Sequence, residues 1–464
     1  MLPSPFPMNP PPSRRRFLQS LLAAAGGILA VGQRLRAATE PPRAAGAKAV
    51  TRLAAPRMER IRWGLIGLGD RGTSQLEELI ELEHCEVTAL CDTDPIVLKR
   101  AADMLEKAKH RPAAMSGASA EAYRKLVERD DVDAVMICTP WRAHVPQAVA
   151  AMRAGKHAFI EVPAAVSLEE CWQLVDAAES TQRHCMMMEN CCYGQEELMV
   201  LRLCREGILG ELLHAEAAYI HDLRFQMKQV ERGTGSWRTR EHELRDANIY
   251  PTHGLGPVAQ CLGVNRGDRF TRLTSMSSPS LGMPDFAARE FPPNHPRRTA
   301  KYICGDLNTS LIQTALGRTI MVQHNTMSPR PYSRINLVQG TRGVFAGFPN
   351  RIHVEGRSPE HKWETDLTKW FAEFDHPLWR KVGEVAAKKG GGMGHGGMDY
   401  VMKWRIVECL RAGLPLDHDV YDAAAWSAVT PLSESSVARR GDAIDFPDFT
   451  RGAWKERPPL EINL

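Results

Sequence analysis

Three glycines, Gly67, Gly69 and Gly72, fit the pattern Gly-x-Gly-x-x-Gly, and Asp92 follows about 20 residues later. Glycines at these positions permit a tight turn and bring the backbone close to a pyrophosphate, whose charge is stabilised at a helix N-terminus. A carboxylate at Asp92 is placed to accept hydrogen bonds from ribose hydroxyls, and it repels a 2′-phosphate. The four residues therefore predict a site for NAD rather than NADP.

Two further motifs follow apolar runs and could contact the same ligand. They are residues 139–144, Thr-Pro-Trp-Arg-Ala-His, and residues 161–163, Glu-Val-Pro. Ligands of parallel α/β sheets bind beyond the carboxyl ends of the strands, so we expect both motifs to border one crevice. The 11 cysteines show no Cys-x-x-Cys or Cys/His spacing, and we therefore predict no metal site.

Short apolar runs that alternate with helical patterns must position these residues. Strands are predicted at Ile61–Gly67, Val87–Cys91, Ala134–Cys138, Ala158–Glu161 and Cys185–Glu189, with helices between them. This alternation is typical of an α/β fold, here an N-terminal Rossmann domain with a doubly wound parallel sheet over residues 59–190.

From residue 191 to residue 464 the pattern changes, because strand-like runs follow one another with few helices between them. The runs are Leu212–Ile220, Phe270–Met276, Asn308–Thr314, Thr319–His324 and Arg334–Val338. Such an order predicts a substrate-binding α+β domain with a largely antiparallel open sheet. A glycine-rich stretch at residues 390–397 fits either a mobile lid or a flexible linker.

The N-terminal segment has the layout of an export signal. Arg14, Arg15 and Arg16 precede Phe17 and a short apolar run, and Ala37-Ala38 provide small residues for cleavage. Consecutive arginines resemble the twin-arginine signal, so we expect residues 1–39 to direct export of the folded protein by the twin-arginine machinery. The expected location is periplasmic or secreted, with residues 40–58 as a linker. An uncleaved tail is the alternative.

Composition excludes several classes of partner. A net charge of +4 over 464 residues, part of it in the leader, predicts no binding of nucleic acid. The leader's apolar run is shorter than the roughly 20 residues of a spanning helix, so no stable membrane insertion is expected. The composition does not decide whether the protein forms a homo-oligomer. If the protein is exported folded, it can carry NAD that it bound in the cytoplasm.

The motifs together resemble a known family. A Rossmann domain with Thr-Pro-x-x-x-His and Glu-x-Pro, followed by an open-sheet domain, is similar to the glucose–fructose oxidoreductase/inositol dehydrogenase/MocA family. That family usually has Glu-Lys-Pro, whose lysine assists hydride transfer, whereas this chain has Val162. Longer segments resemble glycoside hydrolase family 109, the NAD-dependent α-N-acetylgalactosaminidases: residues 189–194, 218–224, 237–238, 250–260 and 396–400.

The family 109 resemblance implies roles for individual residues. Together with the glycine motif and Asp92, the implied NAD contacts are Gly67, Gly69, Asp70, Arg71, Asp92, Trp141, Arg142, Ala143, His144, Glu161, Val162, Asn190, Tyr250, Pro251, Thr252 and His253. The implied sugar-binding residues are Tyr219, Arg238, Tyr250 and Tyr332. His253 and Tyr250 are the first candidates for the catalytic base, and Tyr219 and His395 are the second. The histidine is favoured because an imidazole titrates near neutral pH.

The family's chemistry does not need the two carboxylates of ordinary glycosidases, and the sequence identifies no such pair. The resemblance implies a redox-neutral route on terminal α-N-acetylgalactosaminides of a glycan: oxidation at C3, loss of the C2 proton, elimination at C1, hydration and reduction. A periplasmic NAD(P)-dependent sugar oxidoreductase is the alternative, which the absent lysine at Val162 disfavours. A third hypothesis is a catalytically silent sugar-binding protein.

Overall fold

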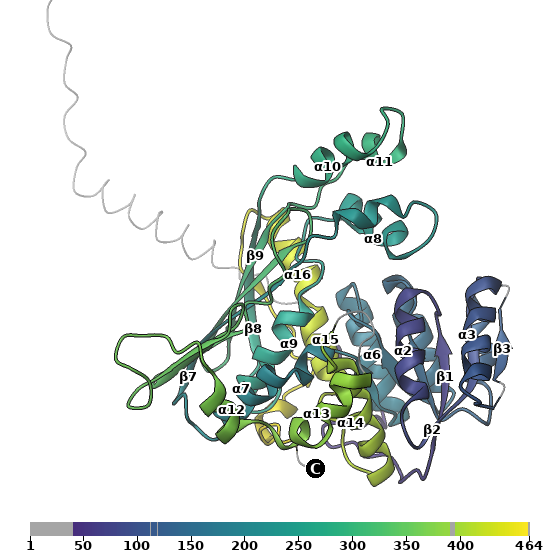
Figure 1. Ribbon diagram of the computed structural model, residues 1–464, viewed down its shortest axis with the longest axis horizontal. Coiled ribbons are helices and arrows are strands. Elements are labelled where there is room, and N and C mark those ends of the chain that lie inside the picture. The colour runs from purple at the N-terminus through teal and green to yellow at the C-terminus, as the bar shows by residue number, and fades with distance from the viewer. Residues whose placement is uncertain (1–39, 112, 118, 390–394, 463–464) are drawn as a thin grey trace, which may run out of the picture. The chain divides into compact units, whose positions relative to one another are not determined.

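Two β-sheets organise the chain from Pro41 to Leu464, which clusters as one unit (Figure 1). The computed structural model describes residues 40–111, 113–117, 119–389 and 395–462. The predicted signal peptide, residues 1–39, lies outside the described residues, as do residues 390–394 of the glycine-rich stretch.

The first sheet is parallel throughout and has the strand order β3-β2-β1-β4-β5-β6. Its direction of winding reverses between β1 and β4, and in such sheets ligands bind beyond the carboxyl ends of the strands at that point. The predicted doubly wound sheet is confirmed. The strands are β1 Ile61–Ile66, β2 Cys85–Cys91, β3 Ala114–Ser116, β4 Ala134–Ile137, β5 His157–Ile160 and β6 Cys185–Met187.

Helices cover this sheet, and two of them begin at side-chain caps. Ser167 and Glu170 form a reciprocal capping box at the start of α6, and the Asp94 side chain caps α3, whose first residue is Pro95. The helices are α2 Asp70–Ile80, α3 Pro95–Lys107, α4 Tyr123–Val127, α5 His144–Arg153 and α6 Leu168–Thr181, preceded at α5 by the short 3-10 helix η1, Trp141–Ala143.

The second sheet has the order β13-β12-β11-β7-β10-β9-β8-β14. Its neighbours pair antiparallel except β7 and β10, which run parallel, so the prediction of a largely antiparallel sheet is confirmed. The strands are β7 Leu212–Ile220, β8 Phe270–Ser277, β9 Asn308–Thr314, β10 Thr319–Asn325, β11 Leu337–Gly340, β12 Gly343–Ala346, β13 Arg351–Val354 and β14 Ile444–Asp445.

One predicted strand of this sheet starts later than expected. We predicted a strand over Arg334–Val338, but β11 begins only at Leu337. Ile335 and Asn336 have φ angles of 61° and 49°, which lie in the left-handed region and are incompatible with an extended strand.

Three helices of the second domain pack against elements of the two sheets. Helix α9, Thr252–Cys261, packs on β7; α14, Met398–Ala412, packs on α2 and β1; and α15, Val420–Ser427, packs on α6 and β6 (Figure 1). The remaining helices are α7 Gln195–Arg205, α8 Thr234–Leu244, α10 Gly282–Glu290, α11 Pro296–Thr299, α12 Thr368–Phe374, α13 Pro377–Lys389 and α16 Val429–Ala438, with the 3-10 turns η2 Asn190–Tyr193, η3 Arg224–Lys228 and η5 Ala453–Glu456.

Residues 40–58, predicted as a linker, contain no helix or strand. They nevertheless pack on the domains, because Arg43 pairs with Glu179 at 2.9 Å and the Val50 N–H donates to the Tyr421 hydroxyl at 3.1 Å. Among the described residues, none of the helices combines the length and apolar character that crossing a bilayer requires.

Candidate active site

The loop between β1 and α2 has the shape that a pyrophosphate requires. Gly67 has a φ of 86°, and a Cβ at Gly72 would lie 1.9 Å from the Gly67 carbonyl oxygen, so both positions require glycine. A Cβ at Gly69 would meet nothing within 4 Å, and no side chain caps α2 there. The space in front of the first N–H groups of α2 is therefore open, and these unpaired donors can bind the phosphates of NAD.

Asp92 stands beside this loop at the end of β2. Its Oδ2 accepts a hydrogen bond from the Leu68 N–H at 2.6 Å, and its Oδ1 accepts one from the Asp94 N–H at 2.8 Å. These bonds fix the carboxylate, and each oxygen keeps a further lone pair for a ligand hydroxyl. The geometry therefore suits the predicted ribose contact.

Arg71 links three segments of the chain. Its guanidinium donates to Glu161 at 2.6 Å and to Asp399 at 2.5 Å, which joins α2 to the end of β5 and to α14. Burial alone would lower the pKa of Arg71, but these two carboxylates raise it well above its usual value. Because its side chain is committed, Arg71 can serve the predicted phosphate contact through its backbone N–H in the first turn of α2.

The other predicted cofactor residues lie along the same edge. Trp141, Arg142 and Ala143 form η1, which with α8 borders a cleft of about 580 Å³ lined also by Trp237. Arg142 pairs with Glu241 of α8 at 2.9 Å.

His144 and Asn190 are both buried at this edge. The two ring nitrogens of His144 lie 2.8 Å and 2.7 Å from the Pro163 and Thr139 carbonyl oxygens, so the ring joins two loops rather than facing the crevice. The Nδ2 of Asn190 has no hydrogen-bond partner among the described residues. An unpaired buried donor of this kind is what a ligand acceptor would satisfy.

Val162 occupies the position at which the oxidoreductase family usually has the lysine of Glu-Lys-Pro, so this position provides no amine. Val162 is buried, and the neighbouring Glu161 is occupied by Arg71 and by the Gln75 amide, each at 2.6 Å. Proton transfer must therefore depend on other side chains.

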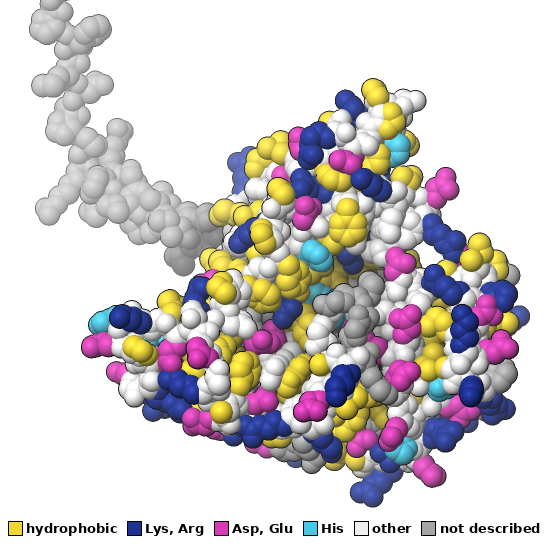
Figure 2. Space-filling view, in the orientation of Figure 1, with side chains coloured by type: hydrophobic (Ala, Val, Ile, Leu, Met, Phe, Trp, Pro, Cys, Tyr) yellow, Lys and Arg dark blue, Asp and Glu magenta, His cyan; other side chains and the backbone are white. Residues whose placement is uncertain are grey.

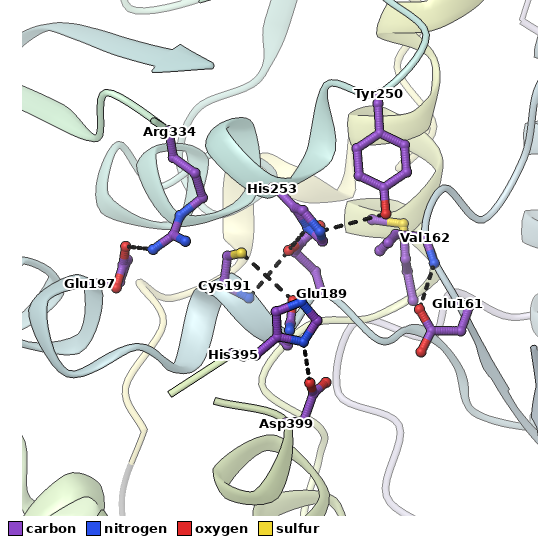
Figure 3. A network of polar contacts seen from close by, with 12 residues as sticks. Glu161, Val162, Glu189, Cys191, Glu197, Tyr250, His253, Arg334, His395 and Asp399 are labelled. Atoms are coloured by element: carbon purple, nitrogen blue, oxygen red, sulfur yellow. Dashed lines mark hydrogen bonds and ion pairs between the residues drawn. The ribbon is translucent and has the colours of Figure 1, made fainter. Parts of the chain in front are cut away.

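Both predicted catalytic residues meet in one aromatic cluster (Figure 3). Tyr250 precedes α9, and His253 lies in its first turn, with ring centroids 5.0 Å apart. Tyr219, near the end of β7, contacts both rings at 4.6 Å and 5.3 Å. The packing of α9 on β7 creates this cluster from residues more than thirty positions apart in the sequence.

A buried carboxylate that the sequence analysis did not assign orients His253. Glu189 is fully buried, and its Oε1 lies 2.7 Å from Nδ1 of His253 (Figure 3). Since a carboxylate accepts, Nδ1 carries the hydrogen and the Nε2 lone pair points toward the Tyr250 hydroxyl, 3.5 Å away. Burial alone would raise the pKa of Glu189, but His253 brings it below its ordinary value.

The two tyrosines of the cluster stay protonated. Burial raises the pKa of Tyr250 well above its usual value and also raises that of Tyr219, against the opposing effect of the nearby Arg238 cation. Neutral tyrosines are hydrogen-bond donors rather than bases. Of the two candidates for the base, the geometry therefore favours His253.

The same region contains a possible metal-ligand set. Glu189, Cys191 and His253 offer ligand atoms within 4.8 Å of one another. Two of these groups are already joined by the 2.7 Å hydrogen bond, and burial raises the pKa of the Cys191 thiol well above its usual value, which opposes the thiolate that a metal needs. The donor set fits an oriented histidine better than a metal centre.

Arg238 of α8 is a cation held by aromatic rings. Its guanidinium carbon lies 5.5 Å from the ring centroids of Trp141 and Trp237 and 5.3 Å from that of Tyr250. Within the described chain its buried Nε has no hydrogen-bond partner. The predicted sugar-binding arginine is therefore positioned by stacking and keeps donors for substrate oxygens.

Two further histidines approach the cluster. Nδ1 of His221 lies 3.2 Å from the Tyr219 hydroxyl, and its ring contacts Tyr332, the remaining predicted sugar-binding residue, at 5.2 Å. His395 lies 2.7 Å from Asp399, which orients it as Glu189 orients His253. Figure 2 shows histidine side chains beside hydrophobic ones near the centre of this face.

Fold and site together define an NAD-binding Rossmann protein with an appended open-sheet domain, whose His253 pairs with Glu189 at the end of the Rossmann domain. Comparison with known families agrees: residues 61–189 match the "Oxidoreductase family, NAD-binding Rossmann fold", and residues 193–456 match "Glycosyl hydrolase 109, C-terminal domain". The cofactor is NAD.

Similar proteins extend over nearly the whole chain. A "Glycosyl hydrolase family 109 protein" of Shewanella amazonensis is 56% identical over 97% of this chain and 98% of its own length. An "Alpha-N-acetylgalactosaminidase" of Shewanella oneidensis is 54% identical over 97% of this chain and 98% of its own. An NAD-binding oxidoreductase of Klebsiella pneumoniae shares the fold, with a TM-score of 0.64 and 17% identity over 84% of this chain and 100% of that chain. The chain belongs to glycosyl hydrolase family 109, a family of glycoside hydrolases.

Proposed function

We propose that this protein hydrolyses terminal α-N-acetylgalactosaminides by an NAD-dependent, redox-neutral route. The observation that carries the proposal is the buried Glu189–His253 pair, which presents Nε2 beside the Tyr250 hydroxyl next to the NAD-binding crevice. The printed name of the Shewanella oneidensis relative supports the choice of substrate.

The carboxylates around the site do not support direct displacement. Glu161 and Asp399 are paired with Arg71, Glu189 with His253, and Glu197 with Arg334. Direct hydrolysis of a glycoside needs two carboxyl groups facing the scissile bond from either side. A route that begins with oxidation at C3 and continues with removal of the C2 proton does not need such a carboxylate pair, and the cluster supplies a base for the C2 proton.

The side chains divide this work by their chemistry. When bound, NAD would supply reversible hydride acceptance at C3 of the sugar, while the C3 hydroxyl proton passes to solvent, and the resulting ketone makes the C2 hydrogen acidic. Nε2 of His253 then removes the C2 proton, and Glu189 stabilises the imidazolium that results. The released electron pair forms the C1–C2 double bond as the C1 substituent leaves; water then adds at C1, the imidazolium returns a proton to C2, and C3 is reduced again. Arg238 binds the C3 oxygen, where negative charge develops. The neutral hydroxyls of Tyr250 and Tyr219 donate hydrogen bonds to the sugar.

The test is an assay of the purified protein with p-nitrophenyl α-N-acetylgalactosaminide and no added NAD. Sustained release of nitrophenol over many turnovers is expected, because the bound cofactor is regenerated in each cycle. Accumulation of NADH absorbance together with an oxidised sugar would instead establish net sugar oxidation. If neither signal appears, the hypothesis that remains is a catalytically silent sugar-binding protein.

We also propose that the chain is exported folded by a twin-arginine signal to the periplasm or the medium. Arg14, Arg15 and Arg16 ahead of a short apolar run support this proposal. Replacing all three with lysine should retain the protein in the cytoplasm, as measured by cell fractionation. An unchanged exported yield would contradict it.

A further inference from the structure

Phe348 presents an aromatic ring to solvent at the outer edge of the site. It lies in the turn between β12 and β13, is 38% exposed, and contacts Tyr332, which is 40% exposed, with ring centroids 5.7 Å apart. Tyr332 in turn contacts His221 at 5.2 Å and Tyr219 at 6.4 Å. Phe348 is therefore linked to the cluster of Tyr219, Tyr250 and His253 through Tyr332, which lies between Phe348 and that cluster in the series of ring contacts.

The backbone under this ring is strained. Phe348 has a φ of 55°, and Ile335, on the facing segment, has a φ of 61°. The Gly347 N–H donates to the Ile335 carbonyl at 3.0 Å, so the two strained segments are bonded to each other. Bulky and β-branched residues rarely adopt positive φ, and strain of this kind gathers at ligand sites, where the surrounding structure must maintain it.

The buried ion pair of Arg334 and Glu197 contacts the rings of Tyr332 and Phe348. Arg334 donates to the Tyr332 hydroxyl at 2.9 Å and to Glu197 at 2.6 Å (Figure 3), and its guanidinium carbon lies 5.0 Å from the Phe348 ring centroid. Desolvation offsets much of the stability that a buried ion pair contributes. We therefore attribute to Arg334 and Glu197 the positioning of two exposed rings.

We propose that Phe348, with the edge of Tyr332, is a platform for the sugar residue to which the terminal N-acetylgalactosamine is attached. This inference rests on the proposed function. A pyranose has an apolar face of C–H groups, and an exposed aromatic ring is the surface on which such a face packs. The terminal sugar occupies the cluster of Tyr219, Tyr250 and His253, so the leaving residue begins about one ring further out, where Phe348 lies.

The test compares two substrates on wild-type enzyme and the variant Phe348→Ala. The first is methyl α-N-acetylgalactosaminide, whose leaving group has no ring, and the second is a disaccharide of N-acetylgalactosamine α-linked to galactose. Released N-acetylgalactosamine is measured by chromatography. Phe348→Ala should lower kcat/KM about tenfold on the disaccharide and leave the methyl glycoside within about twofold, since only the disaccharide loses ring packing.

Two control variants make the result decisive. Phe348→Trp, which keeps an aromatic face, should retain the disaccharide rate, and Trp363→Ala, an exposed ring that packs on Arg351, should change neither rate. Equal loss on both substrates, or loss on neither, would overturn the platform. Failure of the wild-type enzyme to cleave either substrate would count against the proposed function instead. If Phe348→Ala does not fold, Phe348→Leu gives the same comparison.

Discussion

Nδ1 of His253 lies 2.7 Å from Oε1 of Glu189, and Glu189 is fully buried. The pair joins the segment that follows the last strand of the Rossmann sheet to the first turn of α9, so this hydrogen bond connects the Rossmann domain with the second domain. Its chemical consequence is a defined tautomer, with the Nε2 lone pair available for a proton.

Glu189→Gln should therefore lower kcat by about 10²-fold or more, because the amide neither fixes this tautomer nor stabilises the imidazolium. Bound NAD should be unchanged, and the pH profile of kcat should shift. Glu189→Asp should restore part of the activity, while Glu216→Gln, a change on β7 away from the pair, should have no effect. Wild-type kcat with an unshifted pH profile would refute the role of Glu189.

Asp92→Ala should lower the occupancy of NAD in the purified protein. Each hydrogen bond from a ribose hydroxyl to this carboxylate contributes about 1.5–3 kcal/mol, so affinity should fall at least roughly tenfold. Occupancy is measured by extracting the cofactor after gel filtration, with Asp103→Ala on the exposed side of α3 as the control. Finding NADP in the wild-type extract would overturn the assignment of Asp92.

Arg238→Ala should lower kcat/KM by about 10²-fold and leave bound NAD unchanged, because the guanidinium is held by three rings and no carboxylate bond is lost. The melting temperature should change little, since each cation–π contact contributes only about 0.5–1 kcal/mol. Arg289→Ala, on exposed α10, is the matched control. An unfolded Arg238→Ala protein would show that Arg238 is structural.

Acid should destabilise the Rossmann domain through two adjacent histidines. Burial lowers the pKa of His157 to about 3 and that of His184 to about 4, with their rings 5.0 Å apart. Unfolded histidines titrate near 6.5, so this stability is complete above pH 6.5 and is lost as the pH falls toward 4 and 3. Between pH 7 and 5 each histidine should contribute a loss of about 2 kcal/mol.

The variant His184→Phe tests this pH dependence, because it keeps a ring and removes one titrating group. Urea unfolding at pH 7 and pH 5 should show a loss smaller than that of wild type by about 2 kcal/mol. The exposed His361→Asn should behave like wild type. Equal losses in wild type and His184→Phe would contradict the assignment.

The sequence predicted local structure well and long-range pairing poorly. The glycine loop, Asp92 and the strands flanking them were recognisable because spacing along the chain determines their geometry. The bond between Arg71 and Asp399 spans 328 positions, and nothing near Arg71 indicates that its guanidinium is committed. Glu189 was visible as the neighbour of Asn190, but its contact with His253 depends on how α9 packs. Positive φ at Ile335, which helped to displace β11, has no local signal in a β-branched residue, whereas Asn336 is a residue type that tolerates this conformation.

The most direct test of the account is hydrolysis of p-nitrophenyl α-N-acetylgalactosaminide in D₂O, followed by mass spectrometry or proton NMR of the released sugar. If His253 removes the C2 proton, the base exchanges that proton with solvent, and the product should carry deuterium at C2. Reduction of the enzyme with borohydride should abolish activity until it is reoxidised. Product without deuterium at C2, released at full rate by reduced enzyme, would contradict the account and would show that the glycosidic bond is broken without chemistry at C2.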